Sequence, residues 1–232
     1  MLSSMNAMQR GGVYILFGGV VSAVGRALKP GVFVDSVDWN NVDGIVQAMA
    51  DNEVLTHTSA VLYAFGLMFV LTGLNSIRHF VTDQGLVGDM VRGGTLLGML
   101  SLFVIAVLEG FDHMAVRVLD DGIGGSSSMD IAVSMQSAKL GIVLIALPVL
   151  YASIGVAGLG GIRLLPGGLH RMVQSIASLV MLATAVLLLM AGSLDSNDFW
   201  NAVQTITAIV LALWIIALSH ASHSGKVSAS TS

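Results

Sequence analysis

The sequence predicts an all-α protein: a polytopic bundle of about six transmembrane helices with both termini in the cytoplasm. Of its 232 residues, 55% are hydrophobic and only 10% are charged, and the mean hydropathy is +0.85. A soluble domain carries charge on roughly a quarter of its positions, so a soluble fold could not bury this much apolar surface. The apolar runs continue from Tyr14 to Leu218 with no long polar interval. This favours a single transmembrane domain over residues 1–221, followed by a disordered cytoplasmic tail at 222–232.

A transmembrane helix needs about 20 apolar residues and must satisfy its own backbone hydrogen bonds, because lipid offers none. Runs that meet this requirement, or come close to it, lie at 11–28, 54–76, 93–110, 140–161, 172–193 and 199–219. The first run has only about 15 residues before Arg26. Because Arg26 shortens the first run, that run could also be the apolar core of a cleaved signal peptide. We expect it to be retained, with Arg26 extending to the interface.

The basic residues predict the orientation. With the N-terminus in the cytoplasm, six of the ten basic residues fall on the inner side, namely Arg10, Arg78, Arg92, Arg163, Arg171 and Lys226. The other four fall on the outer side, namely Arg26, Lys29, Arg117 and Lys139. This excess of inner positive charge favours cytoplasmic termini.

The first outer loop, at 30–53, contains a short amphipathic pattern. Its apolar residues recur at helical spacing: Val42, Ile45, Val46 and Met49. This spacing predicts a helix that lies on the membrane surface.

Charge and cysteine content exclude several functional classes. The net charge is −4, and the ten basic residues are scattered singly rather than clustered. Nucleic-acid binding requires clustered Lys and Arg, so that class is excluded. The chain has no cysteine, which excludes disulfides, thiolate catalysis, cysteine-ligated metal centres and c-type haem attachment.

One group of ionisable residues is predicted at the outer face. Glu109, Asp112 and His113 share a helical face because they are three or four residues apart. His57 lies at the outer end of the preceding span, and antiparallel packing of consecutive spans would bring it toward them. Histidine and carboxylate side chains bind divalent transition metals, so His57, Glu109, Asp112 and His113 form a candidate metal site.

Other interpretations of this group remain open. The residues could relay a proton, or they could simply be interfacial residues wetted by the headgroup region. An outer haem between His57 and His113, or an inner one between His79 and His170, is a further alternative, so the cofactor stays unknown.

Small residues predict close helix packing, as at Gly18 and Ser22 in the first run and Gly155 and Gly158 in the fourth. Such faces could pack within the bundle, against a membrane-protein partner, or against a second copy of the chain. The lipid bilayer is the expected surrounding of the apolar helices.

Two motifs carry a resemblance to a known family. The opening segment at 10–16 reads RGGVYIL, and GIRLLPGGLHR at 161–171 precedes the fifth run. Together with the acidic first outer loop, they resemble an uncharacterised bacterial family of six-span integral membrane proteins. The resemblance implies a fold and a membrane location, and it transfers no functional residue.

The sequence therefore favours an accessory or partner-binding membrane subunit, with enzymatic activity left open. A metal- or haem-binding redox protein with a site at the outer face is the second hypothesis. A small proton-coupled carrier is the third, because the middles of the spans, such as 62–72 and 180–190, carry no charge. Short loops and the lack of an Asn-x-Ser/Thr sequon are typical of a bacterial inner membrane.

Overall fold

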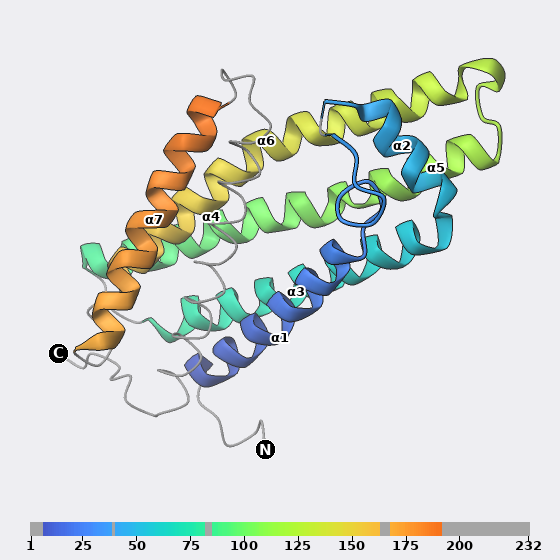
Figure 1. Cartoon of the computed structure of the whole chain (residues 1–232). Coiled ribbons are helices and arrows are strands. Elements are labelled where there is room, and N and C mark those ends of the chain that lie inside the picture. The colour runs from blue at the N-terminus through green and yellow to red at the C-terminus, as the bar shows by residue number, and fades with distance from the viewer. Residues whose placement is uncertain (1–6, 39, 82–84, 163–167, 192–232) are drawn as a thin grey trace. The chain divides into compact units, whose positions relative to one another are not determined.

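The computed structural model describes residues 7–38, 40–81, 85–162 and 168–191. In this part of the chain the structure is helical, and its sole β feature is an isolated bridge between Pro30 and Val34. The helices are α1 (Ala7–Ala27), α2 (Val42–Asp51), α3 (Glu53–Phe80), α4 (Leu86–Leu108), α5 (Gly110–Asp120), the short 3-10 helix η2 (Gly125–Ser127), α6 (Ser128–Gly161) and α7 (Leu169–Ala191) (Figure 1). The predicted all-α class is confirmed.

Four described segments are long and apolar enough to cross a membrane: Glu53–Phe80, Leu86–Asp120, Gly125–Gly161 and Arg171–Met190. The predicted spans 54–76, 93–110 and 140–161, and the described part of 172–193, fall on these segments. The predicted span 11–28 falls on α1, which is helical but is not among the four. The predicted span 199–219 and the tail at 222–232 lie outside the described residues.

Two of these segments are longer than a bilayer requires. Leu86–Asp120 has 35 residues and α6 has 34, and at 1.5 Å per residue each extends about 50 Å. The hydrocarbon core is about 30 Å thick. If these helices cross a bilayer, part of each lies outside the hydrocarbon or the helix is strongly tilted within it, and polar residues near the helix ends can then be hydrated or buried in protein.

The described residues divide into two compact units. Unit 1 contains residues 7–17, 69–81, 85–102, 146–162 and 168–191, and unit 2 contains 18–38, 40–68 and 103–145. The prediction of one transmembrane domain over 1–221 stays a prediction.

Small residues allow close helix packing within unit 1. A Cβ added at Gly73 of α3 would lie 2.6 Å from the carbonyl oxygen of Gly11 in α1. One added at Gly94 of α4 would lie 2.6 Å from the carbonyl oxygen of Ser153 in α6. A Cβ at Gly158 of α6 would clash with α7. The small residues therefore pack helices of this chain against each other, as in other membrane bundles.

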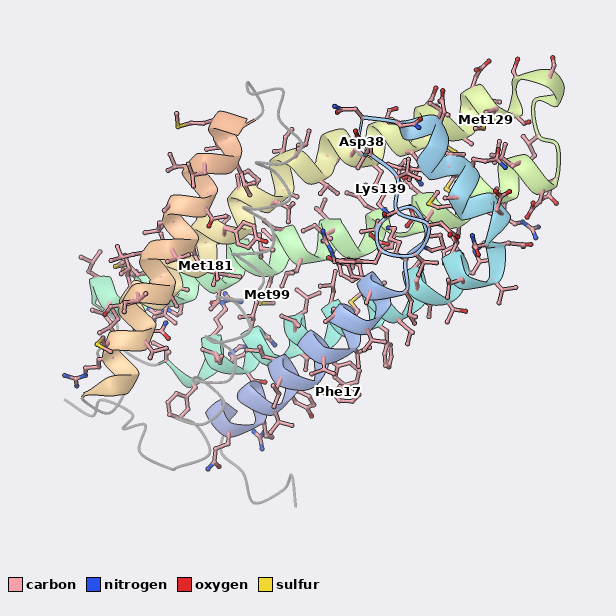
Figure 2. The ribbon with its side chains drawn as sticks, in the orientation of Figure 1. Phe17, Asp38, Met99, Met129, Lys139 and Met181 are labelled. Carbon is pink, nitrogen blue, oxygen red and sulfur yellow. The ribbon has the colours of Figure 1, made fainter. Side chains whose placement is uncertain are left out.

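Unit 2 contains the short helix α2 and its packing partners. The Asn41 side chain caps α2 by accepting a hydrogen bond from the Gly44 amide at 2.9 Å. Figure 1 shows α2 lying across α5. A buried apolar cluster joins residues of α2, α5 and α6: Ile45, Val46, Met49, Ala115, Val116, Val118 and Ala132. Met129 of α6, labelled in Figure 2, packs against this cluster.

This packing corrects the expected role of α2. The predicted helix forms, but its apolar face is not free to enter the membrane surface. Val46 and Met49 are both 0% exposed because they pack against α5 and α6. An amphipathic pattern does not distinguish a lipid surface from a protein surface, since both bury the same apolar stripe.

We predict that Gly66 in unit 2 cannot accept a side chain. A Cβ there would lie 2.6 Å from the carbonyl oxygen of Gly18, on the facing helix α1. Gly66→Ala should destabilise the protein by about 1–3 kcal/mol through overpacking, seen as a lower Tm by circular dichroism in detergent. Gly141→Ala is the matched control, because nothing lies within 4 Å of a Cβ at that position of α6. Equal melting temperatures for the two variants would contradict the packing.

Candidate functional site: a buried charge network and a histidine pair

Residues from four segments of unit 2 form a buried charge network. Lys29 lies in the loop after α1, Glu109 joins α4 to α5, Asp112 is in the first turn of α5, and Gln136 and Lys139 are on α6. On each helix the network residues are three apart, so they share a face.

Local turn geometry positions Lys29. The backbone reverses at Gly31, which has a φ of +78°, and the Gly31 amide donates to the Val34 carbonyl at 2.8 Å. Glycine adopts this left-handed conformation at little steric cost. The tight turn follows the end of α1 at Ala27, and the Lys29 side chain contacts Asp112 of α5.

Each lysine bridges both carboxylates. Lys29 Nζ lies 2.9 Å from Glu109 Oε2 and 2.5 Å from Asp112 Oδ2. Lys139 Nζ, labelled in Figure 2, lies 3.0 Å from Glu109 Oε1 and 2.7 Å from Asp112 Oδ1. Gln136 Nε2 donates a further hydrogen bond of 2.8 Å to Asp112 Oδ1. Two positive and two negative groups therefore form a closed ring with no net charge.

The network is withdrawn from solvent. Asp112 is 0% exposed, and Glu109 and Lys139 are each 5% exposed. Burying an isolated charge costs several kcal/mol, and the cost is offset only when the charge is paired and hydrogen-bonded. Because every charge in the ring has two partners of opposite sign, the ring can exist in a buried position.

The pKa of Lys29 reflects this balance. Burial of the ammonium by itself lowers its pKa, but attraction to the Asp112 and Glu109 carboxylates outweighs burial and raises the pKa above its usual value. A raised folded-state pKa stabilises the fold fully below the ordinary lysine value, and that contribution is lost only as pH rises through the folded-state value. Lys29 therefore remains charged, and keeps its role in the ring, throughout the physiological range.

Two histidines meet beside this network. His113 Nδ1 of α5 lies 2.5 Å from His57 Nδ1 of α3. The ring centroids are 4.5 Å apart and the ring planes differ by 13°. Since the nitrogens are much closer than the centroids, the rings meet edge to edge rather than face over face. On its other side, His57 Nε2 lies 3.5 Å from Glu53 Oε1.

The structure separates the four predicted metal-site residues into two pairs. It brings His57 to His113, as antiparallel packing suggested. Glu109 and Asp112 instead form ion pairs with Lys29 and Lys139, and they do not converge with the histidines on one point. Among the described residues, no group of three or more His, Asp or Glu side chains is placed to hold a metal ion. Metal binding by His57, Glu109, Asp112 and His113 stays a prediction.

Sequence reasoning missed Lys29, Gln136 and Lys139 as members of the site. The two lysines served only to orient the chain. A signal was present in α6, because Gln136 and Lys139 share a face just before a long apolar run. A polar pair at that spacing indicates that the helix faces a polar partner there.

No protein-family model, curated protein or solved structure matches the chain.

We predict that Asp112 is essential to stability. Asp112→Asn leaves two lysines facing one carboxylate, and breaking a buried ion pair costs about 3–5 kcal/mol. Thermal unfolding in detergent should show a large loss of Tm. Asp121→Asn is the matched control, because Asp121 pairs with Arg117 at 3.3 Å on the exposed surface of the same helix, where a pair contributes about 0–1 kcal/mol.

A double substitution sharpens this test. Combining Asp112→Asn with Lys139→Gln removes one charge of each sign, so it should recover part of the lost stability. The network is refuted if Asp112→Asn and Asp121→Asn melt alike, or if the second substitution adds its full cost to the first.

Proposed function

We propose that this chain is a multi-pass protein of a bacterial inner membrane that acts as an accessory, partner-binding subunit. The four described segments able to cross a membrane support the membrane location. The resemblance of residues 10–16 and 161–171 to a bacterial six-span family supports the compartment and the six spans. The excess of basic residues on the inner loops supports cytoplasmic termini.

One observation carries the functional part of the proposal. In the described part of the chain, the buried charged side chains are Glu109, Asp112 and Lys139, and they neutralise one another with Lys29. A carrier or ion-binding site needs charged or polar groups that can exchange protein partners for a substrate. Groups that are already paired and buried favour a structural role, in which the network holds the loop after α1 to α5 and α6.

Buried polar groups in unit 1 support the same conclusion. Ser153 Oγ donates to the carbonyl oxygen of Val149 at 2.5 Å, and Ser178 Oγ donates to that of Gln174 at 2.7 Å. Gln174 Nε2 donates to the Gly158 carbonyl at 3.1 Å. These side chains satisfy helix carbonyls, which is how polar residues contribute to packing in membrane bundles.

The orientation predicts which residues a membrane-impermeant reagent reaches. The chain has no native cysteine, so a single introduced thiol reports one position. Ser126→Cys, at an exposed position of η2 before α6, should react with an impermeant maleimide in intact cells. Leu86→Cys, at the exposed start of α4, should react only after the membrane is permeabilised. The reverse pattern would overturn the proposed orientation.

A partner protein should contact the exposed apolar faces of the spans. Leu189 of α7 and Ile145 of α6 are each 70% exposed. A photo-crosslinking residue at either position should give a discrete protein adduct in native membranes. The same residue at Met181, which is 1% exposed on α7, is the control and should give intramolecular adducts only. Adducts with lipid alone at both exposed positions would refute the accessory role.

A metal- or haem-binding redox protein is the second candidate, and the meeting of His57 with His113 favours it. Two imidazoles from different helices are the ligands that such centres use. Binding would require the two nitrogens to turn toward a common metal atom. The metal content of the purified protein decides between the candidates.

A further inference from the structure

His57 and His113 each direct one ring nitrogen toward a common point. His113 Nδ1 of α5 lies 2.5 Å from His57 Nδ1 of α3. Both residues lie within helices, which hold ligand side chains more precisely than loops do. The neutral imidazole nitrogen is the commonest metal ligand in proteins. Two such nitrogens that converge from different helices are therefore the donor set of a metal site.

A carboxylate lies at the opposite edge of the His57 ring. Glu53 Oε1 is 3.5 Å from His57 Nε2, one helical turn away on α3. When a histidine binds a metal through one ring nitrogen, the other nitrogen usually donates a hydrogen bond to a carboxylate, a backbone carbonyl or water. Such a partner fixes the tautomer and the orientation of the ring. Glu53 is therefore placed to keep the hydrogen on Nε2 and to leave Nδ1 of His57 available to a metal.

The described residues supply two protein donors at this point rather than three or four. Glu53 faces Nε2, on the far edge of the ring from the converging Nδ1 atoms. Glu109 and Asp112 are held by the two lysines of the charge ring. Structural zinc sites use four protein ligands, and catalytic zinc sites use three. A metal ion that needs only two nitrogen donors fits this position better than zinc.

Ligand type and charge favour monovalent copper. Imidazole is a good ligand for copper, and Cu(I), with its filled d shell, accepts two nitrogen ligands in a line. The charge ring adds no net charge to the neighbourhood, because two ammonium groups balance two carboxylates. Glu53 then leaves one negative charge beside the histidines. A monovalent ion balances that charge, whereas a dication exceeds it.

Coordination requires the two rings to move apart by a short distance. Bonds between a metal and an imidazole nitrogen are about 2 Å long, so an ion in line between the two Nδ1 atoms needs them about 4 Å apart. Their separation in the structure is 2.5 Å. The side chain of His57 is 28% exposed, so its ring has solvent on one side into which it can turn. The same exposure gives the ion a route of entry from solution.

We propose that Nδ1 of His57 and Nδ1 of His113 together hold one Cu(I) ion between α3 and α5. This inference rests on the second candidate function, a metal-binding protein, and names its metal and its ligands. The two ligands are 56 residues apart in the sequence. An ion that binds both of them only in the folded chain stabilises unit 2 against unfolding.

The direct test is X-ray absorption at the copper edge. The full chain in detergent is treated with a chelator and then loaded with Cu(I) under anaerobic conditions. We expect one copper per chain, the edge shape of a two-coordinate Cu(I) ion, and two nitrogen scatterers that belong to imidazole rings. Sulfur scatterers would overturn the proposal, because the 13 methionines are the competing Cu(I) ligands of this chain. The measurement uses the wild-type chain, so it does not depend on whether a variant folds.

Competition with a colorimetric Cu(I) chelator then measures the affinity of variants. His113→Phe should lower the affinity by more than about 100-fold, which exceeds the usual effect of losing an outer partner. Glu53→Gln keeps both ligands and should lower the affinity by about tenfold. His79→Phe, which removes an exposed histidine at the other end of α3, should leave it unchanged. Equal affinities of His113→Phe and His79→Phe for Cu(I) would rule out the proposed ligands.

Other metals separate the failure of this inference from the failure of the function on which it rests. If the protein binds zinc more tightly than copper, and His113→Phe removes the zinc, the copper assignment is wrong and the metal-binding function stands. If the protein retains no copper, zinc or haem, both are wrong. Neither result changes the crosslinking test of the accessory role.

Discussion

The pairing of Lys29 and Lys139 with Glu109 and Asp112 is the interaction on which unit 2 depends. It joins the loop after α1, the junction of α4 with α5, and α6, three segments that are far apart in the sequence. An ion pair requires particular partner atoms at a short distance, and a buried charge that loses its partner costs several kcal/mol. The ring therefore selects one rotation for each of these helices. The apolar cluster of α2, α5 and α6 then packs around that arrangement.

Helix length explains why such a ring can exist in a membrane protein. The segment Leu86–Asp120 has 35 residues, so it extends about 20 Å beyond the hydrocarbon if it crosses upright. Glu109 and Asp112 fall in its last third, and Lys139 falls in the first half of α6. There the surrounding protein, rather than lipid, excludes water from the charges. The cost of burying these charges is offset by their pairing with one another.

The parts that sequence could predict are those governed by local spacing. The helical class and four apolar spans follow from run length and composition, and Glu109, Asp112 and His113 share a face because of helical periodicity. The approach of His57 to His113 follows from antiparallel neighbours. The pairing of Asp112 with Lys139 does not follow from the order of the helices, because it depends on how α6 is rotated about its axis. Two lysines separated by more than a hundred residues give no sequence signal that they bind the same carboxylates. The direction of the α2 apolar face was likewise unpredictable, because it also depends on how distant helices pack.

A metal ion bound by Glu109 and Asp112 would compete with the charge ring for the same carboxylates. Each carboxylate accepts from both ammonium groups, so a dication would have to displace two lysines and leave their charges buried without partners. Desolvated ammonium groups beside a dication repel it strongly at an effective dielectric constant of about 20 or less. The ring therefore restricts what Glu109 and Asp112 can bind, because any further ligand must first replace a buried ammonium partner.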